Sequence, residues 1–318
     1  MPAIDLTISI VSTDDRETLI SCLENVYSKI SEATSFEVFV VDNANNISEF
    51  VRQKYPGIKI IINEKPKGFS GNHNSIARRS SGKYILFMNP DIFIQEGFVE
   101  NIINTMKMDG MVGIVTGKLL RLDEKTIDST GHIIYKNRRT VDRGQGEEDR
   151  GQYDKKEEVF SACGAAMLCR RTMLEDIKIF DEYFDESFRL YKEDLDLSWR
   201  ARLRGWKIIY TPDAVAYHGR GWASGRTRAK VPRWIRRESY KNRYLMMIKD
   251  DHLINFLRDL PFILWHEIKA LVYVIFREPH LFLAWPQIVS QLPLALKKRS
   301  EIMNKAVVGA NEIRKWFT

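Results

Sequence analysis

Short apolar runs alternate with amphipathic stretches along the first third of the chain. Buried strands are predicted for four runs rich in β-branched and aromatic residues, at 6–11, 37–41, 58–62 and 84–88. Helices are predicted between them, from a capping segment at 12–15 to about residue 30, then over 48–54 and 72–79. Strands and helices that alternate at this spacing predict βαβ units and a mostly parallel sheet.

Three of the predicted strands end in polar residues. The endings are Ser12-Thr13-Asp14, Asp42-Asn43 and Asn89-Pro90-Asp91. Because Pro90 cannot donate to a sheet ladder, the last strand should stop there and hold Asp91 at its carboxyl end. The carboxyl ends of parallel strands share one edge of the sheet, which is where open α/β sheets bind ligands. The pattern therefore predicts a site at this edge.

Further along, polarity separates a predicted loop from a predicted helix. Residues 137–158 are charged and contain glycine but almost no apolar residue, which predicts an exposed, mobile loop. The core resumes at 159–169. A helix is predicted over 193–204, since Leu195, Trp199 and Leu203 fall on one face and Gly205 can end it.

The last third of the chain is apolar but interrupted. Residues 253–296 are rich in Leu, Ile, Phe and Trp, and four prolines divide them. The longest charge-free stretch, 279–296, contains two internal prolines and two glutamines, so we expect no transmembrane helix. We expect amphipathic helices in a membrane interface instead, anchored by Trp265, Trp285 and the basic cluster 297–299. The predicted domains are therefore 1–245 and an amphipathic helical extension, 246–318.

Charge is distributed unevenly along the 318 residues. The net charge is +7, yet residues 1–218 carry 30 Lys and Arg against 34 acids, whereas 219–318 carry 19 against 8. Residues 220–243 hold nine of these cations, interleaved with Trp222, Trp234 and Tyr240. This asymmetry indicates an anionic partner: a phosphate ligand, a membrane surface or nucleic acid.

Three further features of the sequence indicate what kind of protein this is: its hydrophobic content, its first residues and its cysteines. Hydrophobic residues make up 44% of the chain, enough for a sizeable core. The first twelve residues lack the features of a secretory signal, so we expect a cytosolic catalytic part. The three cysteines form no metal-ligand pattern and are expected to be reduced thiols.

Two candidate elements suit a nucleoside diphosphate. Asp91 could hold a divalent cation that bridges both phosphates, although an aspartate after proline is also an ordinary turn residue. Residues 67–74 form a glycine-containing turn that opens a helix, whose N–H groups could face an anion. Neither a Walker motif nor a dinucleotide fingerprint is present.

Two further candidates lie later in the chain. Three acids in four residues, Glu193, Asp194 and Asp196, exceed what a helix start needs, so one could act as a general base. We favour Asp194, although spacing alone does not distinguish the three. His218 follows a strand-like run and begins the basic segment, which suits either a structural histidine or a metal or phosphate contact.

The order of these motifs resembles a known family. ISIVSTDD, EVFVVDNANN, KGFSGNHNSIARRSSGKYILFMNPD, ACGAAMLCRR and FDEYFDESFRLYKEDLDLSWRARLRGWKIIYTPDAVAYHG follow one another along the chain. Over about residues 5–245 the chain resembles inverting family 2 glycosyltransferases of the GT-A fold, in particular rhamnosyltransferase-like bacterial members with Asn-Pro-Asp in place of Asp-x-Asp. The resemblance implies an α/β, Rossmann-like, mostly parallel central sheet with a C-terminal helical membrane-associating extension.

The resemblance also implies roles for individual residues. The implied donor-binding residues are Ser12, Thr13, Asp42, Gly68, Phe69, Asn89, Asp91 and Gly164. Asp194 would be the catalytic base, and Asp91 and His218 would hold Mg²⁺ or Mn²⁺. The chain departs from the family pattern in one place, because Ser12-Thr13-Asp14 stands where these members usually show Asn-Tyr-Asn.

The implied activity is transfer of a sugar from a nucleotide sugar. The first expectation is L-rhamnose from dTDP-rhamnose, moved to a saccharide or polyprenyl-diphosphate-linked acceptor for cell-surface polysaccharide at the cytoplasmic face of the membrane. One alternative is a UDP-hexose donor, and another is a non-catalytic nucleotide-sugar-binding protein. A nucleic-acid-binding protein would use the basic, aromatic tail, but that leaves the acids at the strand ends unexplained, so we expect no nucleic acid partner.

Overall fold

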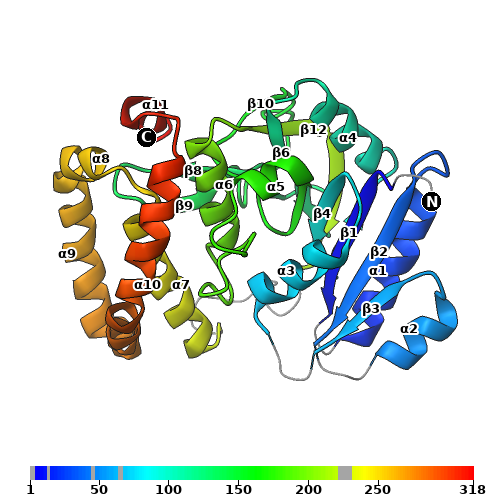
Figure 1. Ribbon diagram of the computed structural model, residues 1–318, viewed down its shortest axis with the longest axis horizontal. Coiled ribbons are helices and arrows are strands. Elements are labelled where there is room, and N and C mark those ends of the chain that lie inside the picture. The colour runs from blue at the N-terminus through cyan, green and yellow to red at the C-terminus, as the bar shows by residue number, and fades with distance from the viewer. Residues whose placement is uncertain (1–3, 13–14, 44–46, 64–66, 221–230) are drawn as a thin grey trace.

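The computed structural model describes residues 4–12, 15–43, 47–63, 67–220 and 231–318 (Figure 1). Two residues singled out in the sequence, Thr13 and Trp222, lie outside these ranges.

The N-terminal half of the sheet is parallel, as predicted. Its strands run in the order β3 (Lys59–Ile62), β2 (Phe36–Asp42), β1 (Leu6–Ser12) and β4 (Tyr84–Met88). The connecting helices are α1 (Arg16–Lys29), α2 (Ser48–Lys54) and α3 (Phe69–Arg79). The Asp15 side chain caps α1 by accepting from the Thr18 N–H at 3.0 Å.

Beyond β4 the sheet becomes mixed. Strand β11 (Ala166–Arg170) lies antiparallel between β4 and β6 (Val112–Arg121), and β12 (Lys207–His218) runs parallel to β6. Three short strands complete it: β5 (Ile92–Ile94) and β10 (Glu157–Glu158) on β12, and β7 (Ile127–Ser129) on β6.

Side chains of the strands alternate between two apolar layers. In β4, Leu86 and Met88 belong to a core shared with α1 and α4 (Phe98–Lys107), whereas Ile85 and Phe87 join a core on the other face. The second core includes residues of α5 (Arg171–Asp176) and α6 (Glu193–Leu203). The sheet is therefore covered by helices on both faces.

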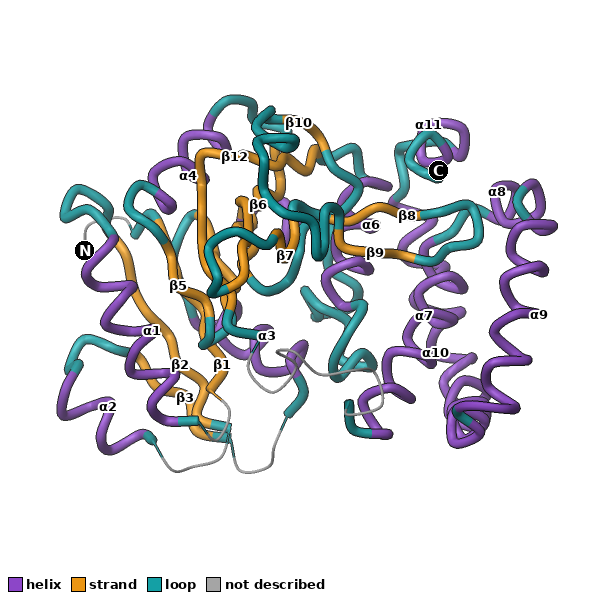
Figure 2. Tube along the Cα trace, turned by 180° about the vertical axis from the view of Figure 1, so that it is seen from behind, coloured by secondary structure: helices purple, strands orange, loops and turns teal. Residues whose placement is uncertain are grey.

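The prediction of an exposed loop at 137–158 is wrong for residues 137–144, whereas residues 145–158 are mostly exposed, as predicted. This segment contains β9 (Thr140–Asp142), which pairs antiparallel with β8 (His132–Ile134), and Figure 2 shows this hairpin beside α6. Arg138 is fully buried and donates to Asp251 at 2.7 Å and Asp259 at 2.9 Å. Its charge is neutralised by partners more than 100 residues away, which local polarity cannot reveal.

The C-terminal third forms a helical layer at one end of the molecule (Figure 1). It consists of α7 (Arg233–Asp250), α8 (Leu253–Arg258), α9 (Leu260–Arg277), the 3₁₀ helix η3 (Pro279–Leu283), α10 (Ala284–Lys305) and α11 (Ala310–Arg314). Leu195, Trp199 and Leu203 of α6 pack against this layer, on the helical face that the sequence predicted. The predicted domain boundary, between residues 245 and 246, lies inside helix α7. Among the described helices, none has the length and apolarity needed to cross a membrane.

A buried ionic cluster ties the helical layer to α6 and the segment before it. Asp185 accepts from Lys298 of α10 at 2.6 Å and pairs with Lys249 of α7. Lys249 also pairs with Asp196 of α6, which in turn binds Arg200 at 2.9 Å. The helix that carries the three candidate acids is thus tied to α7 through the ion pair between Asp196 and Lys249.

Candidate active site

Asp91 and His218 meet where β4 and β12 end. His218 is the last residue of β12 and pairs with Ile92 of β5, and the Gly219 N–H donates to the Asp91 carbonyl at 2.8 Å. His218 Nε2 lies 3.5 Å from Asp91 Oδ1. On its other side, His218 Nδ1 lies 2.8 Å from Oδ2 of Asp128, a fully buried residue of β7.

This arrangement fits a divalent cation. The carboxylate of Asp128 accepts the Nδ1 proton, so Nε2 is the ring nitrogen left to face Asp91 and a metal. A carboxylate and an imidazole are a donor set that suits Mn²⁺. Without metal, burial lowers the pKa of His218, but Asp128 and Asp91 outweigh this effect and raise it to about 9. Arg220 also pairs with Asp128 and fixes this carboxylate from a second direction.

Asp194 lies in the first turn of α6, beside the loop that precedes β11. Its Oδ2 accepts from the Gly164 N–H at 3.0 Å, and its Oδ1 accepts from the Leu195 N–H at 2.8 Å. A Cβ at Gly164 would lie 3.1 Å from Asp194 Cβ and 3.3 Å from Oδ2, so a larger residue would displace the carboxylate. The same loop reaches β4, because the Asn89 N–H donates to the Ala165 carbonyl at 2.9 Å.

The surroundings of the three clustered acids differ. Asp196 is fully buried in its ion pairs. Glu193 is buried, and burial together with the Asp194 charge raises the pKa of its carboxyl group well above the ordinary value. The Asp194 side chain remains 16% exposed, as does that of Asp91. Asp194 is therefore the most exposed of the three acids.

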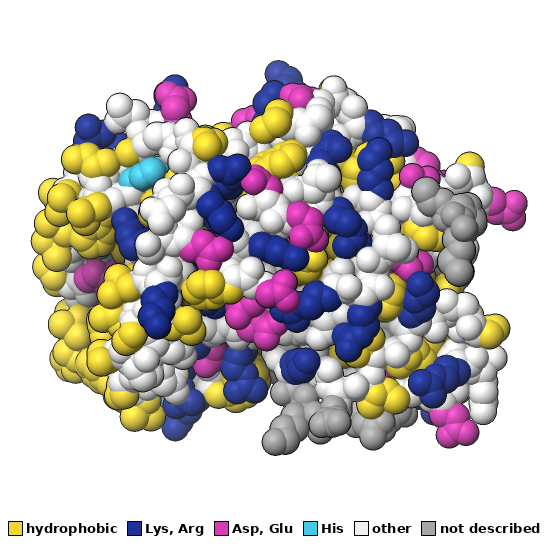
Figure 3. Space-filling view, viewed as in Figure 1, with side chains coloured by type: hydrophobic (Ala, Val, Ile, Leu, Met, Phe, Trp, Pro, Cys, Tyr) yellow, Lys and Arg dark blue, Asp and Glu magenta, His cyan; other side chains and the backbone are white. Residues whose placement is uncertain are grey.

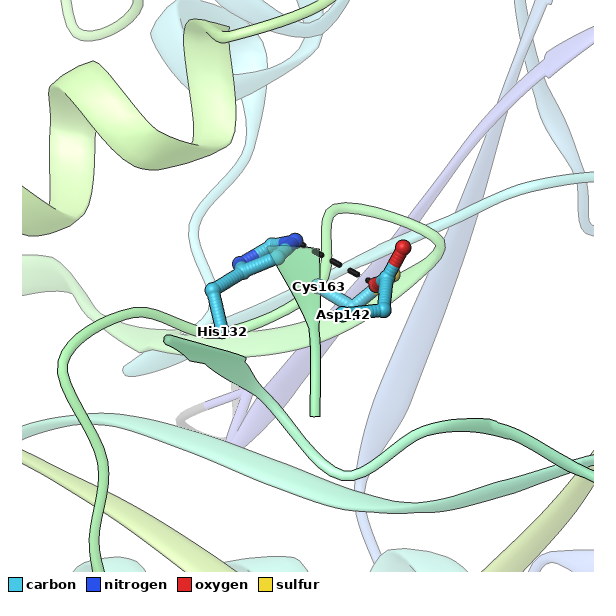
Figure 4. Close-up of side chains that lie close together, drawn as sticks. All are labelled: His132, Asp142 and Cys163. Carbon is cyan, nitrogen blue, oxygen red and sulfur yellow. Dashed lines mark ion pairs between the residues drawn. The ribbon is translucent and has the colours of Figure 1, made fainter. Parts of the chain in front are cut away.

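A chain of charged contacts links Asp194 to Asp91. His132 Nε2 lies 3.9 Å from Asp194 Oδ2 and 3.3 Å from Asp142 Oδ1, and Figure 4 shows this ion pair beside Cys163. Asp142 lies 3.9 Å from Arg220, which leads through Asp128 and His218 to Asp91. The two predicted carboxylates are therefore linked by a continuous chain of contacts through His132, Asp142, Arg220, Asp128 and His218.

Sequence reasoning missed three members of this chain: Asp128, His132 and Asp142. All three lie in strands of three residues, β7 to β9, which are too short to give a clear hydrophobic period. The one available signal was a pair of ionisable residues on either side of a short polar turn, in Asp128-Ser129-Thr130-Gly131-His132.

The predicted nucleotide contacts lie at the ends of β1 and β2. Ser12 is the last residue of β1 and is buried. Asp42 is the last residue of β2, and its Oδ2 accepts from the N–H groups of Ile47 and Ser48 at 3.1 and 3.0 Å. This oxygen therefore anchors the start of α2, a role that the strand-end pattern did not predict.

Gly68 and Phe69 begin helix α3. A Cβ at Gly68 would lie 2.4 Å from the Arg189 carbonyl oxygen, so glycine is needed for the backbone approach. The Phe69 N–H donates to that same carbonyl at 2.7 Å. This N–H is consequently engaged within the protein, and the turn serves to bring residue 189, near α6, against α3.

Comparisons with known proteins agree with this architecture. The fold is similar to that of GalNAc-T7, solved with UDP, GalNAc and Mn²⁺ (TM-score 0.61, 11% identity), over 78% of this chain and 49% of that one. A mannosyltransferase from Pyrobaculum calidifontis, solved with GDP-Man and Mn²⁺, is similar over 98% and 82% (TM-score 0.56, 14% identity). Residues 1–349 of S. aureus TarS, solved with UDP, are similar over 98% of this chain and 90% of that fragment (TM-score 0.57, 13% identity).

The fold and the strand-end site together define a GT-A glycosyltransferase architecture with a mixed central sheet. The chain spans about half the length of GalNAc-T7. A search of curated proteins finds no match. The model for "Glycosyl transferase family 2" matches residues 7–178, more than half of the chain, and the protein belongs to this family.

Proposed function

We propose that the protein is a metal-dependent, inverting hexosyltransferase that moves a sugar from a nucleotide sugar to a saccharide or polyprenyl-diphosphate-linked acceptor. The observation that carries this proposal is the continuous chain of contacts between Asp91 and Asp194, which links a metal-type donor pair to a partly exposed carboxylate. The Mn²⁺ and the nucleotides named for the similar structures support it.

On the donor side, Asp91 and His218 would hold the cation and Asp128 would orient the imidazole. A bound divalent cation neutralises the charge that develops on a diphosphate leaving group. Ser12, Asp42, Gly68, Phe69 and Asn89 would surround the nucleoside, from the same edge of the sheet. Thr13, outside the described residues, would join them.

On the acceptor side, Asp194 would remove the proton from the attacking hydroxyl. The acceptor oxygen bonds to the anomeric carbon as the bond to the nucleoside diphosphate breaks, and attack from the opposite face inverts the configuration. Gly164 leaves room for the donor sugar and supplies an N–H to the Asp194 carboxylate at 3.0 Å. The proton then rests on Asp194 until it passes to solvent.

Asp194→Asn tests this role. A positioned base contributes roughly 10²–10⁴-fold to turnover, so we expect that loss in kcat with donor affinity retained. Glu193→Gln on the same helical turn is the matched control, and it should keep most of the activity because Glu193 is buried, at 5% exposure. Donor affinity that falls together with turnover would assign Asp194 a structural role and refute the proposal.

The donor sugar is proposed as L-rhamnose from dTDP-rhamnose, with UDP-hexoses as the second candidate. A thermal-shift panel of nucleotide sugars with Mn²⁺ ranks them, because a bound donor raises the apparent stability by mass action. Mn²⁺-dependent hydrolysis of the preferred donor separates an enzyme from a non-catalytic nucleotide-sugar-binding protein.

We further propose that 246–318 attach the enzyme peripherally to an anionic phospholipid surface at the cytoplasmic face of the membrane. Helix α9 buries only Ile263 and Val274. It exposes Phe262, Leu264, Trp265, Ile268, Leu271, Val272, Ile275 and Phe276, which we call the apolar face. Apolar side chains gather at this end of the molecule in Figure 3. So large an apolar surface is typical of an interaction site.

Charge favours lipid as the occupant of the apolar face. Lys269 and Arg277 are exposed on the same helix, and Lys297 is exposed on α10. The acids of the same segment are paired internally, Glu267 with Arg243 and Glu278 with Arg236. Exposed cations next to exposed aromatic residues suit an anionic bilayer surface.

Vesicle flotation tests this attachment. The protein should float with vesicles of phosphatidylglycerol and phosphatidylcholine, less with phosphatidylcholine alone, and Phe276→Glu should weaken binding. Arg150→Glu, far along the chain at an exposed position, is the control. If the protein does not bind vesicles but forms a dimer, and Phe276→Glu disrupts this dimer, then the apolar face binds a second copy of the chain instead.

A further inference from the structure

His132 is a buried histidine with polar contacts at both ring nitrogens. The residue is 9% exposed, and its Nδ1 lies 3.1 Å from the Ser161 hydroxyl oxygen. The same hydroxyl lies 3.2 Å from the Ala162 carbonyl oxygen, to which it can donate its one proton. When it does so, the Ser161 oxygen accepts from the ring and Nδ1 carries a hydrogen.

The second ring nitrogen faces two carboxylates. Nε2 lies 3.3 Å from Asp142 Oδ1 and 3.9 Å from Asp194 Oδ2. A lone pair at Nε2 would be repelled by both, whereas an N–H is attracted by both. Asp142 Oδ1 is buried, and no described residue satisfies it with a hydrogen bond. Nε2 therefore carries a hydrogen, and the two carboxylates that face it favour a protonated ring.

We infer that His132 is an imidazolium, held by Asp142, and a positioning residue that keeps the Asp194 carboxylate in place to receive the acceptor proton. This inference rests on the proposed function of Asp194. His132 supports Asp194 Oδ2 from one direction while the Gly164 N–H supports it from another. It acts through Asp194 and does not itself touch a reacting atom.

The other groups packed around the ring are consistent with a cation. Burial lowers the pKa of His132, but Asp142 and Asp194 reverse this effect and raise it above 6.5. The nearest like charge is Lys192, whose own pKa is lowered by burial and whose Nζ donates to Thr140 at 2.7 Å. Arg220 faces Asp142 from the end of β12 at 3.9 Å.

A metal is the competing explanation for the same geometry. His132, Asp142 and Cys163 each offer a ligand atom within 4.8 Å of the others. Thiolate, not thiol, is the metal ligand. Burial and the neighbouring carboxylates raise the pKa of the Cys163 thiol well above its ordinary value in the metal-free site. Zn²⁺ would therefore have to displace the thiol proton when it binds.

The protonation state can be measured without turnover. In metal-free protein labelled with ¹⁵N-histidine, ring nitrogen signals assigned to His132 by their absence in His132→Gln should show two protonated nitrogens at pH 7. Asp142→Asn should lower the pH at which this proton is lost. A neutral ring at pH 7 would overturn the inference. So would Zn²⁺ binding with a stoichiometry of one that Cys163→Ser abolishes.

The positioning role predicts a pH-dependent defect. With the preferred donor, His132→Gln should lower kcat roughly tenfold to a hundredfold at pH 6 to 7. The ratio of the wild-type kcat to the His132→Gln kcat should then fall toward one at the pH where His132 loses its proton. His266→Gln, on α9, is the control with unchanged kcat.

A ratio that does not vary with pH would leave His132 a purely structural residue and refute the inference. Wild-type protein that turns over no donor would refute the proposed function, while the ring protonation measured by NMR would stand.

Discussion

Asp185→Asn tests whether the buried ionic cluster holds the helical layer on the catalytic domain. Asp185 is fully buried between α5 and α6, and its two oxygens serve two different helices. Lys298 of α10 contacts Oδ1 at 2.6 Å, and Lys249 of α7 contacts Oδ2. Asparagine keeps the shape of the side chain but removes the charge that balances these two ammonium groups.

The size of the effect follows from burial. The side chains of Lys249 and Lys298 are only 1% and 2% exposed. Removing one partner of a buried ion pair costs about 3–5 kcal/mol. Because Lys249 keeps Asp196 and Lys298 keeps Glu182, we expect a value near the lower end, about 3 kcal/mol.

The sign of the pH dependence is also determined. Burial raises the pKa of Asp185, but the two lysines outweigh this effect and hold it below the ordinary value. The stabilisation is therefore complete above about pH 4 and is lost as the pH falls below the unfolded-state value. The difference between wild type and variant should be constant from pH 6 to 8.

Urea unfolding at pH 7, followed by tryptophan fluorescence, measures the loss. Glu182→Gln is the matched control, since it removes a carboxylate from the rim of the same cluster, where the side chain is 25% exposed. That variant should lose no more than about 1 kcal/mol. Equal losses in the two variants, or a loss below 1 kcal/mol in Asp185→Asn, would refute the reasoning.

Three further predictions concern the site. Asp128→Asn should weaken Mn²⁺ binding about 10–100-fold in calorimetry, whereas Asp123→Asn in the adjoining exposed turn should not. In EDTA, His218 stabilises the folded protein because its pKa is raised from 6.5 to about 9. This contribution is complete below pH 6.5 and should fall by roughly 3 kcal/mol as the pH rises through 9. His218→Gln should remove this pH dependence. Gly164→Ala should reduce kcat while leaving the unfolding midpoint nearly unchanged, because its Cβ would meet Asp194 at 3.1 Å; full activity would refute the close approach.

The parallel half of the fold was predictable because its signals are local. Apolar runs mark β1 to β4, Asp15 caps α1, and Gly205, at φ +84°, ends the turn after α6. The segment 137–144 was not predictable, because Arg138 is charged in sequence and buried in the fold. Distant acids, Asp251 and Asp259, decide that outcome, and no window of neighbouring residues contains them.

The site divides in the same way. Asp91 and His218 each follow or end a recognisable strand, so strand-end reasoning could select them. Asp194 begins a helix among three acids, and spacing alone did not single it out. Asp128 and His132 lie in short strands without a clear period, and only tertiary contacts reveal what they orient. The pattern also could not show that Asp42 Oδ2 anchors α2, since a strand-end carboxylate suits a ligand and a helix start equally well.

Both at the site and elsewhere in the molecule, acids and bases that look like surface residues in the sequence are paired in the interior. Helix α6 shows the consequence most directly, because Asp194 and Asp196 lie two residues apart and have opposite surroundings. Asp196 is bound by Lys249 and Arg200 and fixes the position of the helix. Asp194, two residues earlier, keeps a side chain that is 16% exposed and accepts from the Gly164 N–H. The basic character of the C-terminal third is thus partly internal, and only the cations that remain exposed, such as those beside the apolar face, are available to an anionic surface.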